Sequence, residues 1–262
     1  MRTKKTEEPN FVRSVGRALK IMEFIAKQQN EASLTEISSE LELGKSTVHG
    51  LLYTLGQCGY VKQLGEKGKY SLDLKLFELG QAVQESLDVK SISTRHTKDL
   101  LEQFGETVQL GVLSGGEVIY LDKLQGLHTI GSLSKIGARL PSYCTGLGKV
   151  LLSQLPEEEI RAVIREEDMI AFTENTITTY EDLFQTLKEI RQKGYALDNE
   201  EIEIGLRCVA APVYNNNGKI VAAVSISGPT TRIKEENLPE LISGVQNCAR
   251  KISSELGYQK NI

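Results

Sequence analysis

The apolar residues of the first sixty positions fall into three blocks with helical spacing. The first block predicts a helix over residues 14–27, with one apolar face formed by Val15, Ala18, Leu19, Met22, Ile25 and Ala26. The second helix begins at a capping box, Ser33 to Glu36 (SLTE), and ends near residue 42. The third follows a sharp corner at Leu43 and Gly44, and its buried side holds Val48, Leu51, Leu52 and Leu55. Three short helices in this order predict a helix-turn-helix.

The period changes from helical to extended after Gly59. Residues 60–64 and 69–72 predict two short strands around a glycine-bounded tip at residues 65–68, which is the wing of a winged helix. Helical spacing then returns in a connecting helix over residues 73–88, with an apolar stripe at Leu72, Leu76, Leu79, Val83 and Leu87. Such a stripe favours packing against a second copy of the chain, and packing within the chain is the alternative.

Helical and extended patterns alternate from residue 89 to residue 262. Helices are predicted over residues 92–104, 145–155, 180–193 and 235–256, and strands over residues 108–113, 118–123, 129–134, 206–213 and 220–227. The turn sequences SGGE (114–117) and NNNG (215–218) predict hairpins, and therefore antiparallel pairing. The predicted organisation is a winged helix-turn-helix domain (1–72), a linker helix (73–88) and an α+β domain (89–262) with one curved sheet.

Charge is unevenly divided between these regions, although the net charge is only −4. Residues 1–80 carry 12 Lys and Arg against 10 Asp and Glu, whereas residues 81–262 carry 19 against 25. The sign suits a front domain that contacts nucleic acid, and random surface charge explains it equally well. No window approaches the ~20 consecutive apolar residues that a bilayer span needs, and residues 1–10 lack the apolar core of a secretory signal. We therefore expect a cytoplasmic protein with no membrane partner.

The cysteines and histidines do not form a metal-binding pattern. Cys58, Cys144, Cys208 and Cys248 include no C-x-x-C pair, which predicts reduced and mostly buried thiols. The three histidines, His49, His96 and His128, are scattered, so neither a metal nor another cofactor is expected.

The sequence Gly44-Lys45-Ser46-Thr47 has the ending of a nucleotide phosphate loop. Such a loop needs a glycine five residues earlier, where this chain has Ser39, and it must follow a strand, whereas residues 33–41 have helical spacing. The alternative is that the outward residues of the third helix, Lys45, Ser46, Thr47, His49 and Gly50, enter the major groove of DNA. Lys45 would then supply a cation, and the two hydroxyls hydrogen bonds, to the DNA backbone.

The wing supplies further candidate phosphate contacts. Lys62, Lys67 and Lys69 lie along the predicted hairpin, although a solvated hairpin with incidental lysines is the alternative. Arg13 and Arg17, at the start of the first helix, complete the predicted DNA-binding set.

Two stretches of the α+β domain suggest a ligand pocket. Thr145-Gly146-Leu147-Gly148 opens a helix, where glycines let a carboxylate approach free backbone amides. Ser225 and Ser227 lie two apart, and therefore on one side of a strand, and buried paired hydroxyls need a partner. The alternatives are that the glycines serve tight packing, that the serines bond neighbouring backbone, and that Cys208 is a small core residue.

Taken together, five segments resemble the IclR family of bacterial transcriptional regulators: SVGRALKIMEFI, LTEISSELELGKSTVHGLLYTL, GARLPSYCTGLGKVLL, GYALDNEE and RCVAAPVYNNNGKIVAAVSISGP. The resemblance covers about residues 14 to 256. It implies a GAF-like effector-binding domain and sequence-specific DNA binding by a homodimer, or a dimer of dimers, on a palindromic operator. It also implies control of DNA binding by a small organic acid; we expect a repressor, and an activator is the alternative.

In family members that bind small keto acids, the acid is held by backbone amides at a helix start and by an aspartate, a cysteine and two serines. The resemblance places these roles on Gly146, Leu147, Asp198, Cys208, Ser225 and Ser227. One departure is Gly50, where the family commonly has arginine, so the operator sequence does not carry over.

Two other classes of function are weighed against the regulator. An architectural DNA-binding dimer would use its back domain only for dimerisation. A cysteine-dependent enzyme would use Cys144, whose thiol pKa is expected to be lowered beside a helix amino terminus, but no His or carboxylate is placed beside it by the sequence. We expect no enzymatic activity.

Overall fold

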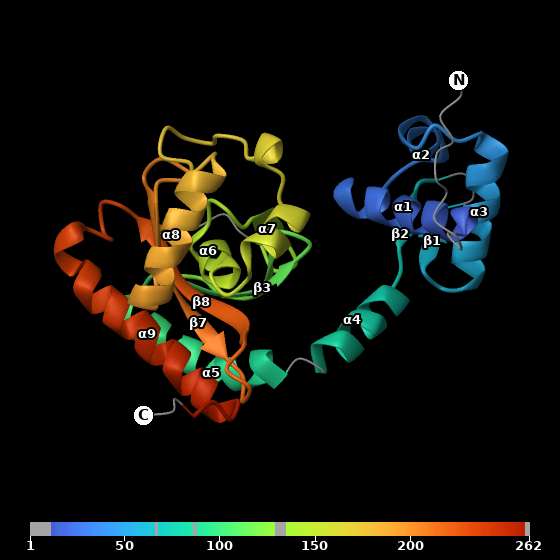
Figure 1. Cartoon of the computed structure of the whole chain (residues 1–262). Coiled ribbons are helices and arrows are strands. Elements are labelled where there is room, and N and C mark those ends of the chain that lie inside the picture. Colours follow the sequence, from blue (N-terminus) through green and yellow to red (C-terminus); the bar gives the residue numbers. More distant parts are fainter. Residues whose placement is uncertain (1–11, 66–67, 86–87, 129–134, 260–262) are drawn as a thin grey trace, which may run out of the picture. The chain divides into compact units, whose positions relative to one another are not determined.

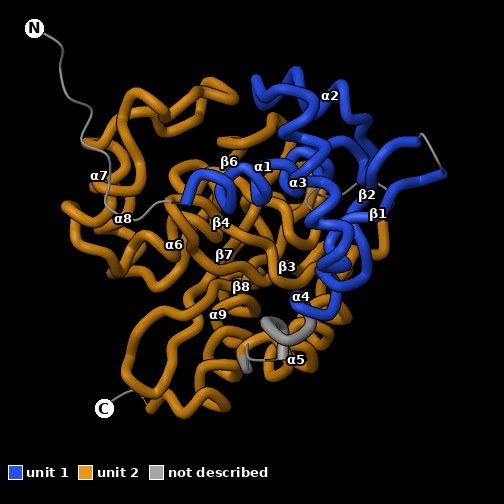
Figure 2. The backbone as a smooth tube through the Cα atoms, turned by 90° about the vertical axis from the view of Figure 1, so that its right-hand side faces the viewer, with its two compact units in different colours: residues 1–86 blue, residues 87–262 orange. Residues whose placement is uncertain are grey.

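The computed structural model describes residues 12–65, 68–85, 88–128 and 135–259 (Figure 1). The predicted strand over residues 129–134 and the predicted DNA contact Lys67 lie outside the described residues. The chain divides into two compact units, residues 1–86 and 87–262, which are described separately (Figure 2). The boundary lies within two residues of the predicted end of the linker helix.

Unit 1 contains three helices, α1 (Arg13–Lys27), α2 (Leu34–Glu40) and α3 (Lys45–Gln57), followed by the two-stranded antiparallel sheet of β1 (Val61–Gln63) and β2 (Tyr70–Leu72) and by α4 (Lys75–Glu85). The predicted capping box is confirmed, because the Glu36 amide donates to the Ser33 hydroxyl at 3.2 Å and the Ser33 amide donates to the Glu36 carboxylate at 2.7 Å. The three helices and the hairpin enclose one small core around Ile21, Ile25, Ile37, Val48 and Leu52.

The apolar face of α1 divides into a buried and an exposed part. Ile25 is buried, together with Ile21, which was not among the predicted face residues. Val15 and Leu19 were predicted on that face and are 55% and 49% exposed. Helical spacing alone therefore indicated an amphipathic helix but not which part of its wide apolar surface meets the core.

Unit 2 is built on a six-stranded sheet with the order β5-β4-β3-β8-β7-β6, in which all neighbours are antiparallel. The strands are β3 (Thr107–Ser114), β4 (Glu117–Leu124), β5 (Arg139–Pro141), β6 (Ala196–Asn199), β7 (Leu206–Tyr214) and β8 (Ile220–Pro229). Both predicted hairpins, β3–β4 and β7–β8, are confirmed. The α+β class of the domain is therefore confirmed.

Helices cover both faces of this sheet (Figure 1). On one face α5 (Asp88–Phe104) and α9 (Leu238–Glu255) pack over a core that includes Val209, Val224 and Ile226. On the other face α6 (Gly146–Leu152) and α8 (Tyr180–Lys193) pack over Tyr120, Ala210 and Ala223, with α7 (Glu157–Val163) beside them. Alternate residues of β7 and β8 thus serve different cores. Two 3₁₀ turns, Glu166–Asp168 and Glu235–Asn237, complete the described elements.

The differences from the predicted elements involve short segments. The helix predicted over residues 145–155 ends at Leu152, and the last helix begins at Leu238 after a 3₁₀ turn. The strands β5 and β6 and the helix α7 were not predicted. Segments of three to seven residues repeat a period too few times to show it.

Candidate functional site

Unit 1 presents a polar surface on the first two turns of α3. Lys45, Ser46, Thr47 and His49 are exposed, whereas Val48 between them is fully buried. This follows from the 3.6-residue period, which turns one residue in each turn toward α1 and α2 and the others outward. Arg13 and Arg17, on α1, are also exposed.

The two described wing lysines have carboxylate neighbours. The Lys62 Nζ lies 3.4 Å from Asp73 Oδ1, and the Lys69 Nζ lies 3.7 Å from Glu31 Oε2. Both lysines are about half exposed. Such exposed ion pairs contribute only about 0.2–1 kcal/mol, so a phosphate can replace either carboxylate at little cost.

Gly50 is not required by the fold of α3. A Cβ added at this position would meet no atom within 4 Å, and its φ is not positive. Its carbonyl accepts a hydrogen bond from the Thr54 hydroxyl at 3.0 Å, which any residue could do. The absent side chain thus leaves open surface on a part of α3 where His49 and Tyr53 are also exposed.

The pocket of unit 2 is positioned by strand register. Ser225 pairs with Gln109 of β3 and Ala210 of β7, and Ser227 pairs with Cys208. Cys208 in turn lies opposite Asp198 of the edge strand β6. Paired residues share a face of the sheet, so residues far apart in sequence converge beneath α6.

These side chains surround a cavity of about 30 Å³, roughly the space of one water molecule. All six residues assigned to the effector site by resemblance line it. The complete lining is Gln109, Tyr120, Leu140, Thr145, Gly146, Leu147, Asp198, Ile202, Leu206, Cys208, Ser225 and Ser227.

The two serines bond to side chains of adjacent strands. The Ser225 hydroxyl donates to Gln109 Oε1 at 3.2 Å, and the Cys208 thiol donates to the Ser227 hydroxyl at 3.1 Å. Cys208 is partly exposed to the cavity and is not a closed core residue. The cavity floor is therefore a row of polar groups within an otherwise apolar sheet.

The start of α6 forms the opposite wall. Thr145 caps the helix, since its hydroxyl accepts from the Gly148 amide at 3.2 Å. Gly148 serves packing, because an added Cβ would lie 2.3 Å from the Ser142 Cα. At Gly146 an added Cβ would meet no atom closer than 3.4 Å, so packing alone does not require that glycine.

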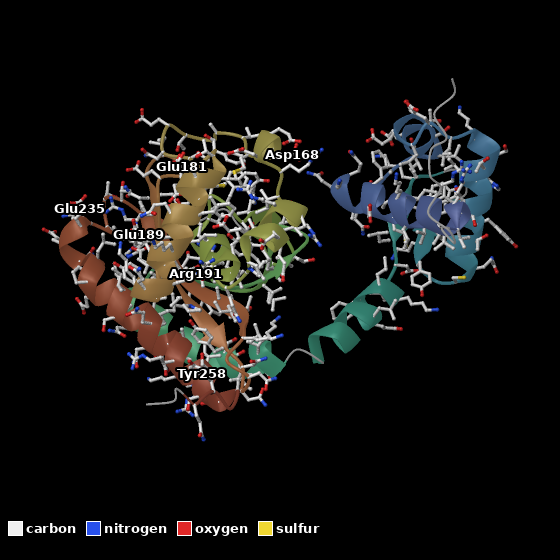
Figure 3. The ribbon with its side chains drawn as sticks, viewed as in Figure 1. Asp168, Glu181, Glu189, Arg191, Glu235 and Tyr258 are labelled. Atoms are coloured by element: carbon white, nitrogen blue, oxygen red, sulfur yellow. The ribbon has the colours of Figure 1, made fainter. Side chains whose placement is uncertain are left out.

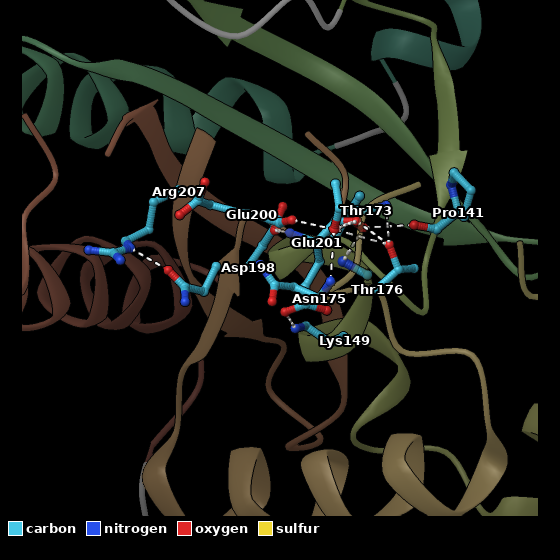
Figure 4. A network of polar contacts seen from close by, with 12 residues as sticks. Pro141, Lys149, Thr173, Asn175, Thr176, Asp198, Glu200, Glu201 and Arg207 are labelled. Carbon is cyan, nitrogen blue, oxygen red and sulfur yellow. Dashed lines mark hydrogen bonds and ion pairs between the residues drawn. The ribbon is translucent and has the colours of Figure 1, made fainter. Parts of the chain in front are cut away.

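Three ionisable groups meet beside the cavity (Figure 4). The Lys149 ammonium, on α6, is paired with the Glu201 carboxylate, and both side chains are buried. Asp198 is 1% exposed, and its Oδ1 accepts from the Glu201 amide at 2.9 Å. Burial first, and the charge of Glu201 second, raise the pKa of Asp198 to about 7, against the lowering effect of the Glu201 amide and of Lys149.

Four polar or ionisable side chains at or beside the cavity were not predicted: Gln109, Tyr120, Lys149 and Glu201. Burial raises the pKa of the Tyr120 phenol, with the nearby Cys208 and Asp198 adding to the effect. Lys149 did leave a signal, because it lies three residues after Gly146 in an apolar helix (GLGKVLL). A lysine in such a helix requires a buried partner, and Glu201 lies in the DNEE segment on which the family resemblance rests.

The expectation of a lowered thiol pKa at Cys144 is wrong. Cys144 is fully buried, and burial raises its pKa to about 12, with Asp198 and Glu201 adding to the effect. Desolvation of the thiolate outweighs any effect of the adjacent helix start.

The expectation of mostly buried thiols is also only half right, since Cys58 is exposed and Cys208 partly exposed. Within the described ranges no group of His, Cys, Asp and Glu could hold a metal ion.

Comparison with known proteins identifies both units. The family described as IclR helix-turn-helix domain matches residues 14–65, and the one described as Bacterial transcriptional regulator IclR C-terminal matches residues 81–254. The chain belongs to the IclR family of transcriptional regulators.

Individual IclR-family proteins match almost the whole chain. The HTH-type transcriptional regulator KdgR of Escherichia coli (strain K12) is 38% identical over 252 residues, which cover 96% of this chain and 95% of that protein. Transcriptional repressor IclR of the same organism is 34% identical over 248 residues, covering 94% of this chain and 90% of that protein. The crystal structure of Thermotoga maritima IclR is 34% identical with a TM-score of 0.75, over 94% of this chain and 99% of that one.

The fold removes one of the two interpretations of Gly44 to Thr47, the nucleotide phosphate loop. IclR-type proteins are DNA-binding transcriptional regulators, and the matched helix-turn-helix region contains this segment. The segment lies at a helix–helix corner and not after a strand, so a nucleotide phosphate loop is excluded.

Among the helices described here, none is long and apolar enough to cross a bilayer.

Proposed function

We propose that this IclR-family protein is a repressor whose binding to a palindromic operator is controlled by a small organic acid bound in unit 2. One observation carries the proposal. The six residues that the family resemblance assigns to the acid surround a single polar cavity, in the same chain as an exposed helix-turn-helix.

On the DNA side, the start of α3 enters the major groove, with Lys45, Ser46, Thr47 and His49 toward the DNA. Arg13, Arg17, Lys62, Lys67 and Lys69 contact phosphates around it and provide affinity that depends on salt more than on sequence. The exposure of the described members of this set supports the assignment.

On the ligand side, the acid's carboxylate accepts hydrogen bonds from the amides of Gly146 and Leu147, which as first-turn amides have no acceptor within the helix. Cys208, Ser225 and Ser227 bond the remaining oxygens, and Asp198 accepts a hydrogen bond from a hydroxyl or from a hydrated carbonyl group.

An acid of several heavy atoms exceeds a cavity of about 30 Å³, so binding displaces part of the wall. The residue 200–205 connection, which contributes Ile202 to the lining, is the segment that gives way. It is held to the 173–176 segment by hydrogen bonds from the Thr173 hydroxyl to the Glu200 carbonyl and from the Thr176 hydroxyl to the Glu201 carbonyl, both at 2.6 Å. The open and closed arrangements supply the two states that a ligand needs in order to change operator affinity.

The working unit is a homodimer or a dimer of dimers. Exposed apolar side chains in unit 1 support this, because monomers seldom expose several large ones together. They lie along α1 and its start, at Val12, Val15 and Leu19, and along α4 and its start, at Leu74, Phe77 and Leu79.

The test is fluorescence anisotropy of labelled promoter fragments from the protein's own genome, titrated with and without a set of small organic acids. We expect at least one fragment to bind at low salt and at least one acid to change its Kd by about 5- to 150-fold. Calorimetry of the same acids discriminates the architectural alternative. A protein that binds DNA but shows no heat with any acid has no effector, and the proposal then fails.

A further inference from the structure

The geometry points to a pocket that accepts a single carboxylate together with one proton from solvent, the proton residing on Asp198, and that rejects dicarboxylates. This inference rests on the proposed effector function and specifies the class of acid and the regulation of its site.

The charged groups around the cavity leave no cation for an incoming anion. None of the residues that line it, within the described part of the chain, is Lys, Arg or His. Lys149, the ammonium beside it, is already paired with Glu201. Arg207, the next residue to Cys208 on β7, directs its guanidinium to the Asn199 side chain at 2.7 Å and to the Ile233 carbonyl at 2.9 Å.

The anionic groups, in contrast, outnumber the cation. Asp198 and Glu201 are both buried, and among the residues that the structure describes they share Lys149 as their one neighbouring cation. The other titratable groups that face Asp198 are Tyr120 of β4, Cys144 before α6 and Cys208 of β7, and burial keeps all three in their neutral forms. With Asp198 ionised, the group of side chains carries one uncompensated negative charge. A ligand carboxylate would bring a second uncompensated negative charge into a buried site, and a low-dielectric interior strongly opposes this.

The proton is assigned to Asp198 and not to Glu201. Glu201 is in direct contact with the Lys149 ammonium, which stabilises its ionised form. Asp198 lines the cavity, and its hydrogen-bond donors within the described residues are neutral: the Glu201 amide and the Cys208 thiol. A protonated Asp198 also gains a hydrogen-bond donor for a ligand oxygen. Its pKa of about 7 makes the uptake possible at neutral pH.

A dicarboxylate cannot be balanced in the same way. One proton on Asp198 compensates for one ligand charge, and Glu201 cannot take a second proton without leaving Lys149 as an unpaired buried cation. The pocket is therefore selective for monocarboxylates through charge, independently of the shape of the acid.

The experiment is calorimetry of the full chain with three matched pairs of acids: lactate and tartronate, gluconate and glucarate, and 4-hydroxybenzoate and terephthalate. Each pair differs mainly by a second carboxylate, and the monocarboxylates stay ionised as carboxylates between pH 6 and pH 8. Titrations in phosphate and in imidazole, which both buffer between pH 6 and pH 8 and whose ionisation enthalpies differ, give the number of protons taken up.

For a monocarboxylate that binds, we expect uptake of about 0.9 proton at pH 8 and about 0.1 at pH 6, with a Kd about tenfold weaker at pH 8. The matched dicarboxylate should bind on the order of 100-fold more weakly or not at all. In Asp198→Asn the binding enthalpy should be the same in both buffers, because the residue that takes up the proton is gone. The control Asp168→Asn, at an exposed aspartate on the surface of the same unit (Figure 3), should retain the buffer dependence.

The outcomes separate this inference from the proposed function. Binding of a monocarboxylate with equal enthalpies in both buffers at pH 8, or with a dicarboxylate partner of equal affinity, overturns the inference and leaves the effector function standing. The wild-type data decide this point even if Asp198→Asn does not fold. If none of the six acids binds at either pH, the effector proposal fails and this inference fails with it.

Discussion

The two units place their charged residues in opposite environments. On the DNA-binding side, Lys45 is exposed, and the ion pairs of Lys62 and Lys69 are open to water. Beside the cavity, Lys149, Asp198 and Glu201 are buried and depend on one another. Exposed cations remain available to a polyanion and contribute little to folding, whereas buried ones stabilise the fold only while every partner is present. The same side chain, lysine, therefore has different consequences when it is removed from each unit.

The largest difference is expected between Lys149→Met and Lys188→Met. Lys149→Met leaves Glu201 buried without its cation, which should lower the free energy of unfolding by about 3–5 kcal/mol. Lys188 is exposed on α8, so Lys188→Met should change the free energy of unfolding by less than about 0.5 kcal/mol. Urea denaturation at pH 7.5 measures both. The loss in Lys149→Met should shrink at lower pH, since burial raises the pKa of Glu201 and the carboxyl then protonates. Equal, small losses would show that the pair does not support the fold.

The pH dependence of stability tests the environment of Asp198. Its folded-state pKa, about 7, is raised from an ordinary value of 3.8, so the native state holds a proton that the unfolded chain has released. The stabilisation of the native state by this proton is complete below pH 3.8 and is lost as pH rises to about 7. Over this range the free energy of unfolding falls by up to about 1.4 kcal/mol per pH unit. Asp198→Asn removes this decrease. The difference in unfolding free energy, variant minus wild type, should therefore grow from pH 5 to pH 7 and level off above it; a constant difference would contradict the burial argument.

The contrast between the units also explains what the sequence could predict. The helix-turn-helix is a local structure, and the spacing of Val48, Leu52 and Leu55 indicates which side of α3 faces outward. The pocket is not local. It depends on the register that sets Asp198 opposite Cys208 and Cys208 opposite Ser227, and on a lysine and a glutamate 52 residues apart. Of its residues, Gly146, Ser225 and Ser227 gave local signals, and Leu147, Asp198 and Cys208 came from family resemblance. Lys149 left a signal in its apolar helix, but its pairing with Glu201 required the structure.

A smaller effect, on DNA binding alone, is expected from Lys45→Ala. The change should weaken binding to all fragments and reduce the slope of log K against log salt by about one, with no loss of stability because the side chain is exposed. Anisotropy at several salt concentrations, with urea denaturation as the control, measures both quantities. Tyr53→Phe on the same helix keeps the charge and should keep the salt slope. An unchanged slope in Lys45→Ala would remove Lys45 from the phosphate contacts.

The smallest expected effect compares two helical glycines, one in each unit. Gly50 has open space where a Cβ would lie, so Gly50→Ala should raise the unfolding free energy of the DNA-binding unit by up to about 1 kcal/mol, as alanine does in a helix interior. Gly148 faces the backbone of Ser142, with 2.3 Å to its Cα, so Gly148→Ala should destabilise unit 2 despite the same gain in helix propensity. Thermal denaturation of both variants gives the two signs.

If Gly50→Ala is stabilising, the fold of α3 does not require Gly50, and access to DNA is the explanation to test. If Gly50→Ala stabilises the protein and yet weakens operator binding, the absent side chain is itself part of DNA recognition. If operator binding is unchanged, Gly50 contributes neither to the stability of α3 nor to DNA recognition.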